Sequence, residues 1–150
     1  MNAAPGNASR LDLAAMVVPL GRALMAAEQP VLDAHGLTMW AYAVLSYLDE
    51  TPLRTQAALA EAIHADKTRI IAVLDDLESR GLLTRRLDPK DRRVRLLSLT
   101  SEGRQLRDLV QAAVQNREER MLGQIPAADR ETFLRSLRTL YEVSQSRPGR

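Results

Sequence analysis

The sequence of 150 residues contains no cysteine, two histidines and only five aromatic residues. The lack of cysteine excludes disulfide bonds, thiolate metal sites and thiol redox sensing. His35 and His64 leave little for a histidine metal site, so we expect no cofactor. No apolar run approaches the ~20 residues that cross a bilayer. Because residues 1–10 also lack the pattern of a signal peptide, we expect a cytoplasmic protein that has no membrane partner.

Motifs of the common enzyme classes are also missing. The sequence has no P-loop, no Gly-x-Ser-x-Gly motif and no His-Glu-x-x-His motif. The adjacent pairs Asp75–Asp76 and Glu118–Glu119 diverge on a helix, so neither is an acid–base couple. We therefore do not expect an enzyme.

The positive charges are concentrated in one segment of the chain. With 45% hydrophobic and 27% charged residues, the chain suits a single domain, 1–150, with a hydrophobic core. Its net charge is +2, yet residues 80–107 hold nine basic and three acidic side chains. Residues 1–79 hold five basic and ten acidic ones. This basic segment indicates an anionic partner or, alternatively, a solvated charged surface.

The middle of the chain predicts three helices that begin after Thr38, Thr55 and Asp66, each a suitable N-cap. The helices at 56–63 and 66–80 are joined by a tight turn at His64, and together they predict a helix-turn-helix. Histidine tolerates the left-handed conformation that such a turn often needs, so we assign His64 a structural role. Apolar residues at helical spacing predict the buried faces: Ala41, Val44, Leu45 and Leu48, then Leu59, Ala60 and Ile63, then Ile70, Val73, Leu74 and Leu77.

A β-hairpin is predicted directly after the helix that Gly81 ends. Two β-prone stretches, 82–87 and 92–99, flank the turn Asp88-Pro89-Lys90-Asp91, and the tip of this hairpin is strongly basic. A helix-turn-helix at about 38–99 that carries a wing at about 82–99 is a winged helix-turn-helix. The fold class is therefore mainly α with a small β-hairpin wing.

A long N-terminal helix is predicted by the apolar face of Leu13, Val17, Leu20 and Leu24, with Ser9 or Asp12 as its cap. Pro19 and Pro30 lack the N–H donor of a helix interior, so we expect a bent or broken segment between about 11 and 34.

Two further helices are predicted after Thr100 and Pro126, and the tail from Ser144 is expected to be disordered. Their apolar residues exceed what the winged domain can cover. A second copy of the chain would bury them, which predicts a homodimer.

The string Leu77-Glu78-Ser79-Arg80-Gly81-Leu82 continues through Asp88-Pro89-Lys90-Asp91-Arg92-Arg93 to Leu99-Thr100-Ser101-Glu102-Gly103. It resembles the signature of the MarR family of bacterial transcription regulators, and the similarity extends from about 11 to 141. The resemblance implies a homodimer whose dimerisation helices lie at about 11–35 and 101–145. It also implies a sequence-specific regulator of double-stranded, pseudo-palindromic operator DNA. Many members are repressors that a small phenolic, aromatic or lipophilic effector releases, and some are activators.

The start of the recognition helix at 66–80 supplies Lys67, Thr68 and Arg69 to the major groove. Arg69 is the candidate for reading guanine and Lys67 for a phosphate contact; the alternative is that Arg69 is a solvated helix residue. Ala72 stands behind them, where the family often has a polar or basic residue. Phosphate contacts are also expected from Arg54, Thr55 and Gln56 at the start of the preceding helix.

In the wing, the resemblance implies that Arg93 enters the minor groove while Asp91 holds its guanidinium in place. Lys90 and Arg92 would then bind phosphate. Arg85, Arg86 and Arg95 either contribute to DNA binding or solvate the hairpin.

The resemblance also places the effector near the first two helices. The candidates are Met25, His35, Met39, Trp40, Tyr42 and Tyr47. Aromatic residues at helical spacing also suit a hydrophobic core. The alternative is therefore a winged-helix regulator, or an interaction module, without a small-molecule effector.

Overall fold

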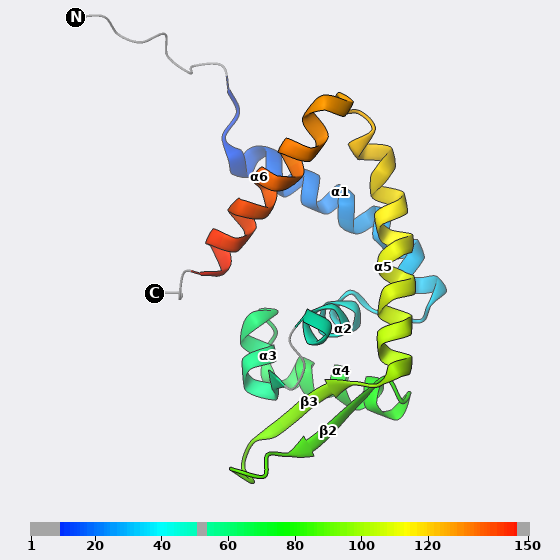
Figure 1. Cartoon of the computed structure of the whole chain (residues 1–150), viewed down its shortest axis with the longest axis vertical. Coiled ribbons are helices and arrows are strands. Elements are labelled where there is room, and N and C mark those ends of the chain that lie inside the picture. The colour runs from blue at the N-terminus through cyan, green and yellow to red at the C-terminus, as the bar shows by residue number, and fades with distance from the viewer. Residues whose placement is uncertain (1–9, 51–53, 147–150) are drawn as a thin grey trace, which may run out of the picture. The chain divides into compact units, whose positions relative to one another are not determined.

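A computed structural model describes residues 10–50 and 54–146, without the side chains of residues 49, 50 and 54. Its helices are α1 (Leu13–Ala34), α2 (Met39–Glu50), α3 (Gln56–Ala62), α4 (Lys67–Ser79), α5 (Ser101–Leu122) and α6 (Ala127–Gln145), and its strands are β1 (Arg54–Thr55), β2 (Leu83–Leu87) and β3 (Arg95–Leu99) (Figure 1). The chain forms two compact units, 1–113 and 114–150. In the described ranges, no helix has the length and hydropathy needed to span a membrane. The predicted fold class, mainly α with a hairpin wing, is confirmed.

Side-chain caps fix where four of these helices begin. Each cap accepts a hydrogen bond from a backbone N–H three residues further along the chain. The donor–acceptor pairs are Ala41 N to Thr38 Oγ1 at 3.1 Å, Ala58 N to Thr55 Oγ1 at 3.1 Å, Arg69 N to Asp66 Oδ1 at 2.8 Å and Gly103 N to Thr100 Oγ1 at 3.0 Å. All four caps were predicted from the sequence.

Left-handed residues turn the chain after α1, α3 and α4. Their φ angles are 63° at Gly36, 55° at His64 and 71° at Gly81. Glycine adopts this conformation without steric cost, and histidine tolerates it better than most residues. The predicted structural role of His64 in the helix-turn-helix is therefore confirmed.

The helix α1 is continuous, although Pro19 and Pro30 both lie inside it. Of the predicted bend or break, the break was therefore wrong. Proline removes one backbone hydrogen bond, but its fixed φ of about −65° is helical, so the turns on either side can hold the helix together. Asp12 occupies the N-cap position without a side-chain hydrogen bond, and Ser9 lies outside the described residues.

The last helix is longer than the sequence predicted. The helix α6 continues to Gln145, and the backbone N–H and hydroxyl of Ser146 both donate to the carbonyl oxygen of Glu142. The expected disorder from Ser144 was therefore wrong as far as residue 146, because local hydrogen bonds extend the helix. Residues 147–150 lie outside the described part of the chain.

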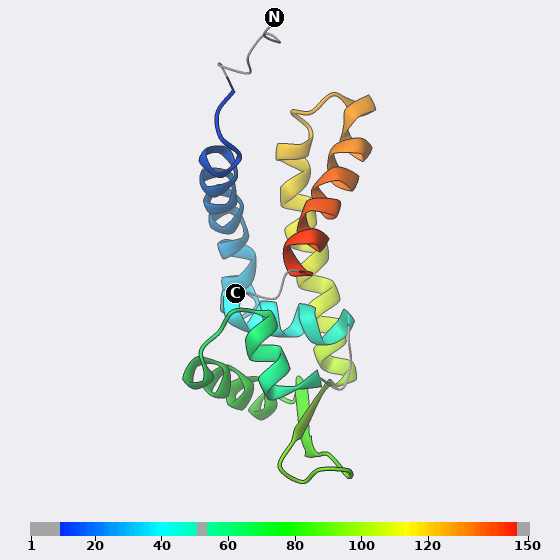
Figure 2. The same ribbon diagram turned by 90° about the vertical axis from the view of Figure 1, so that its left-hand side faces the viewer.

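The wing belongs to an antiparallel sheet of strand order β1–β3–β2. In its register, Leu83 pairs with Leu99 and Leu87 with Arg95, while the short β1 pairs Arg54 with Leu97. Only the hairpin was predicted, because a strand of two residues leaves no alternating pattern in the sequence. Figure 2 shows the hairpin projecting beyond α3 and α4.

The core of the first unit lies between the sheet and the helices α2 to α4. The buried hydrophobic side chains include Val44, Leu45, Leu48, Leu59, Ile70, Leu74, Leu77, Leu83 and Leu97. The predicted buried faces of α2, α3 and α4 are therefore confirmed except at Ile63 and Val73, which are half-buried. Burial of this set fixes α3 and α4 against the root of the wing.

Two arginines tie α4 to neighbouring segments. The Arg80 guanidinium donates to the carbonyl oxygens of Gly36 at 2.8 Å and His35 at 3.3 Å, at the turn between α1 and α2. The Arg85 guanidinium on β2 binds Asp75 at 2.6 Å and Glu78 at 2.9 Å, and the backbone N–H of Arg85 also donates to Glu78. Only 16% of the Arg85 side chain is exposed, so this arginine contacts α4 rather than solvent.

The contact between Arg85 and Glu78 changes the pKa of the Glu78 carboxyl. The hydrogen bond from Arg85 lowers the pKa of the Glu78 carboxyl below its ordinary value of 4.5, although partial burial opposes this effect. Because the folded state favours ionised Glu78, the pair stabilises the fold above about pH 4.5. That contribution is lost as the pH falls through the lowered pKa.

Replacing Arg85 with methionine should therefore raise the pKa of Glu78 toward 4.5. It should also lower the free energy of unfolding near neutral pH by no more than about 1 kcal/mol, because both acidic partners are partly exposed. The loss should shrink below pH 4.5. Carboxyl NMR titration and urea unfolding at several pH values measure both effects. The matched control is Arg86→Met on the exposed neighbour, and an unchanged Glu78 pKa in Arg85→Met would contradict the pairing.

Candidate nucleic-acid interface

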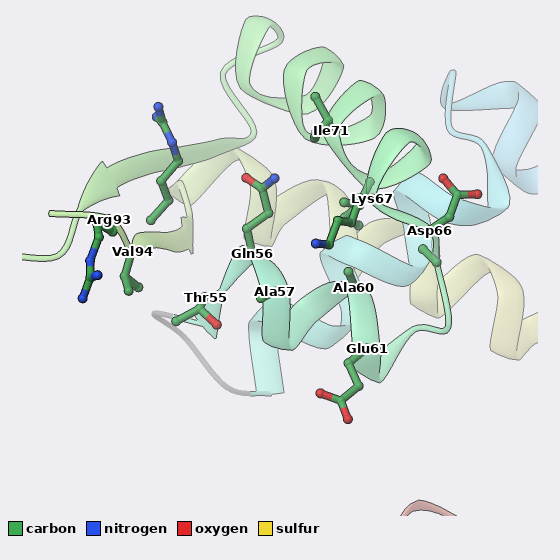
Figure 3. A pocket seen from close by; sticks show the side chains of 13 residues that line it. Thr55, Gln56, Ala57, Ala60, Glu61, Asp66, Lys67, Ile71, Arg93 and Val94 are labelled. Carbon is green, nitrogen blue, oxygen red and sulfur yellow. The ribbon is translucent and has the colours of Figure 1, made fainter. Parts of the chain in front are cut away.

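A recess of about 680 Å³ lies between the helix-turn-helix and the wing. It is lined by one side of α3 with the turn after it, by the first turns of α4 and by the wing where its loop enters β3 (Figure 3): Thr55, Gln56, Ala57, Ala60, Glu61, Ala65, Asp66, Lys67, Ile70, Ile71, Arg93, Val94 and Arg95. The recess thus brings together three segments that the sequence analysis assigned separately to DNA binding.

The start of α4 presents its polar side chains to solvent. Lys67, Thr68 and Arg69 are all exposed, as is Ala72 one turn later. Figure 3 shows Gln56 and Lys67 projecting into the space between α3, α4 and the wing. Because Asp66 accepts the Arg69 N–H, the first turn of α4 is fixed in the orientation that presents these groups.

The tip of the wing carries a preorganised arginine. The carboxylate of Asp91 accepts hydrogen bonds from Arg93 Nε at 3.1 Å, from Nη2 at 3.3 Å and from the backbone N–H at 3.1 Å. These bonds lower the pKa of the Asp91 carboxyl. The side chain of Arg93 is nevertheless 91% exposed, so its guanidinium is oriented yet accessible. The predicted contact between Asp91 and Arg93 is therefore present.

The predicted DNA-binding residues differ in their relation to the recess. Thr55, Gln56, Lys67, Arg93 and Arg95 line it. Thr68, Arg69, Arg86, Lys90, Asp91 and Arg92 do not appear in its lining, although Lys90 and Arg92 are exposed in the same wing loop. The backbone of Arg54 forms β1, but its side chain lies outside the described part of the structure.

The apolar part of the lining was missed by the sequence analysis. Ile71 is 44% exposed and lines the recess from α4, and the half-buried Val94 lines it from the wing. The available signal was that Ile71 falls outside the buried stripe that Ile70 begins. An apolar residue on the outer face of a recognition helix suits contact with the methyl group of thymine.

The effector candidates do not gather in this recess. Met25 of α1 is exposed, while Met39, Tyr42 and Tyr47 are half-buried residues of α2. His35 Nδ1 lies 2.9 Å from the carbonyl oxygen of Val31. Trp40 instead lies beneath the Arg69 guanidinium, with 5.3 Å between Cζ and the ring centroid. The described residues include no group of three or more acidic, histidine or cysteine side chains suited to a metal ion.

The charged groups around the recess suit a polyanion better than a single anion. Lys67, Arg93 and Arg95 supply positive charge from two elements, and the N-termini of α3 and α4 add partial positive charge. Two carboxylates, Glu61 and Asp66, also line the recess. Asp66 is committed to its cap, and Figure 3 shows Glu61 pointing away from the space between α3 and α4. The cationic groups are thus spread along a surface, as successive phosphates would require.

Comparisons with known proteins agree with this geometry. The model of the MarR family matches residues 35–94. The transcriptional regulator HosA of Escherichia coli O111:H- is 32% identical over 107 residues, which is 71% of this chain and 79% of HosA. The structure of CouR from Rhodococcus jostii RHA1, bound to p-coumaroyl-CoA, is 28% identical, with a TM-score of 0.77 covering 98% of this chain and 99% of CouR.

The MarR family protein RV2887 of Mycobacterium tuberculosis, in complex with salicylic acid, is 26% identical to this chain. Its TM-score is 0.73, covering 89% of this chain and 98% of RV2887. These similarities extend well beyond the helix-turn-helix to the long helices on either side. The chain belongs to the MarR family of transcriptional regulators.

Proposed function

We propose that the protein acts in the cytoplasm as a homodimeric repressor that binds pseudo-palindromic double-stranded operator DNA and is released by a small aromatic effector. The observation that carries the proposal is the joint placement of the start of α4 and the Arg93 wing tip around one cationic recess. Membership of the MarR family supports a regulatory role.

The two parts of this surface suit the two grooves of DNA. The start of α4, with Lys67, Thr68 and Arg69, enters the major groove in a helix-turn-helix. Arg69 is the candidate for guanine, and Lys67 is the candidate for phosphate. Thr55 Oγ1 accepts the hydrogen bond that caps α3, and its hydroxyl hydrogen is still a donor, so Thr55 and Gln56 are both candidates for a phosphate contact at this end of the helix.

The wing then reaches the neighbouring minor groove. A narrow minor groove concentrates negative potential and attracts an inserted arginine. Arg93 meets this requirement because Asp91 orients its guanidinium while leaving it exposed. Lys90 and Arg92 are exposed in the same loop and are candidates for phosphate contacts, as are Arg86 and Arg95 on the two strands of the wing.

Replacing Arg93 with alanine should weaken operator binding by about 1–3 kcal/mol per half-site while leaving the fold intact, because this side chain is 91% exposed. The slope of log K against log salt should also fall by about 0.9 per lost phosphate-region contact. Fluorescence anisotropy titrations on one operator duplex at several salt concentrations measure both quantities.

The charge-matched control for Arg93→Ala is Arg138→Ala, an exposed arginine of α6 that pairs with Glu142 at 3.3 Å. This control should change neither the affinity nor the salt slope. Equal affinities for wild type and Arg93→Ala would remove the wing tip from the DNA-binding surface. Failure of the wild-type protein to bind any duplex would instead favour an interaction module.

The homodimer is proposed from the apolar faces that the chain leaves exposed. None of the residues of α6 is buried, although Phe133, Leu134, Leu137, Leu140 and Tyr141 form one apolar face at helical spacing. In α1, Leu13 and Val17 are each 55% exposed. Apolar surface of this extent marks an interaction site, and a second copy supplies the same faces under two-fold symmetry.

Replacing Leu137 with glutamate should convert the dimer to monomer at micromolar concentration, because a charge would have to be buried in the interface. Sedimentation velocity measures the mass, and anisotropy titration should show weaker binding to a two-half-site operator. Thr139→Glu, on the opposite face of α6, should leave the dimer intact. A wild-type monomer that still binds the operator tightly would contradict the proposed assembly.

A small aromatic effector is proposed because CouR and RV2887 were each solved with an aromatic ligand. The candidate residues near α1 and α2 remain Met25, His35, Met39, Trp40, Tyr42 and Tyr47. An effector shifts the protein away from DNA only by binding more tightly to the form that does not fit the operator. An effector bound near α2 would act on the position of α4, because Arg80, at the end of α4, donates a hydrogen bond to the carbonyl oxygen of Gly36 in the α1–α2 turn.

Salicylate, used as the probe, should lower operator affinity by about fivefold or more, and operator DNA should lower salicylate affinity by the same factor. Because DNA binding depends on salt, the control is acetate at equal ionic strength. Anisotropy and calorimetric titrations measure the two factors. Equal operator affinity in salicylate and acetate would favour a regulator without an effector of this class.

A further inference from the structure

The Arg69 side chain is held on both sides at the start of α4. Its Cζ lies 5.3 Å from the ring centroid of Trp40, which belongs to α2. Its Nε lies 3.8 Å from Asp66 Oδ2, while Asp66 Oδ1 accepts the backbone N–H of the same arginine at 2.8 Å. One carboxylate and one indole ring therefore act together on a single guanidinium.

This guanidinium nevertheless stays available to a ligand. The side chain of Arg69 is 53% exposed, and that of Asp66 is 66% exposed. The cation–π contact is made through the face of the indole ring, which accepts no conventional hydrogen bond, so it does not use the N–H donors that a base would need. The Trp40 ring thus restricts the orientation of Arg69 without occupying its hydrogen-bonding edge.

The backbone that carries this ring is firmly placed. Trp40 lies in the first turn of α2, where Thr38 accepts the backbone N–H of Ala41 at 3.1 Å. Ala41, the next residue, is buried in the core. The half-buried Trp40 therefore stands on a capped core helix rather than on a loop.

We propose that Trp40 is a positioning residue for DNA recognition: it holds the Arg69 guanidinium in the orientation that meets a base in the major groove. The inference rests on the proposed function and adds to it a determinant that lies outside the recognition helix. An arginine that is already ordered loses less conformational freedom on binding, and each side chain immobilised only on binding costs about twofold to tenfold in affinity.

A double-mutant cycle tests this role. The variants are Trp40→Leu, Arg69→Met and the pair combined, titrated against an operator duplex selected from a random pool and against an unrelated duplex. Trp40→Leu should weaken operator binding about twofold to fivefold, as expected for an exposed cation–π contact, and should leave binding to the unrelated duplex nearly unchanged. In the Arg69→Met background, Trp40→Leu should add no further loss.

The matched control cycle pairs Trp40→Leu with Lys67→Met. Lys67 is a cation in the same turn of α4, and no contact with the Trp40 ring is proposed for it. These two losses should multiply, because the contact that Trp40 makes is still present when Lys67 is replaced. Losses that multiply in both cycles would overturn the positioning role.

A second readout needs no DNA. Trp40 is the sole tryptophan, so the emission spectrum of the free protein reports its surroundings. Arg69→Met should shift this spectrum and Lys67→Met should leave it unchanged. If Trp40→Leu does not fold, as thermal unfolding would show, Trp40→Phe takes its place in the cycle because it keeps a weaker aromatic face.

The outcomes separate this inference from the proposed function. If Arg93→Ala weakens operator binding but Arg69→Met does not, the protein binds DNA and the positioning role is wrong. If Arg69→Met weakens binding while the Trp40 cycle is multiplicative and the emission spectrum does not shift, Arg69 contacts DNA without Trp40. Absence of all DNA binding in the wild type would overturn the proposed function itself.

Discussion

The interaction on which the proposed DNA-binding surface depends is the pairing of Arg85 with α4. It joins β2 to the middle of α4 through Asp75 and Glu78, and its arginine is mostly buried. The short β1 holds the β3 edge of the wing through its pairing with β3, and Arg85 holds the β2 edge against α4. The position of Arg93 relative to the start of α4 therefore depends in part on a contact made two to three turns further along the helix.

Local features of this fold were predictable from the sequence, because the interactions that decide them span only a few residues. Thr55 and Asp66 each cap the helix that follows, by accepting a backbone N–H three residues further along the chain. His64 adopts the left-handed conformation in the turn between α3 and α4. The same short range explains the error at Pro19. A proline predicts the loss of one backbone hydrogen bond, but the hydrogen bonds of the neighbouring turns decide whether the helix continues. The local sequence pattern does not compare these two contributions.

The candidate site was predictable only in part, for the same reason. The contact between Asp91 and Arg93 spans two residues, and it follows from the sequence of the wing tip. The contact between Trp40 and Arg69 joins two helices, so it appears only when α2 and α4 are packed together. The helical spacing sets Ile71 outside the buried stripe of α4, but only the packed structure shows that it lines the recess.

Arg80 and Arg85 also pair with the acidic residues of α4, which affects the charge of the proposed DNA-binding surface. Asp75, Asp76 and Glu78 would repel the phosphate backbone if the later turns of α4 approached it. Arg85 pairs with two of these carboxylates, and Arg80 lies 3.5 Å from the third, Asp76. The pairs that hold the helix in place therefore also offset the negative charge of its later turns. In the proposed complex, the positive potential offered to DNA is then set by the first turn of α4 and by the wing tip, which would restrict the angle at which the helix enters the groove.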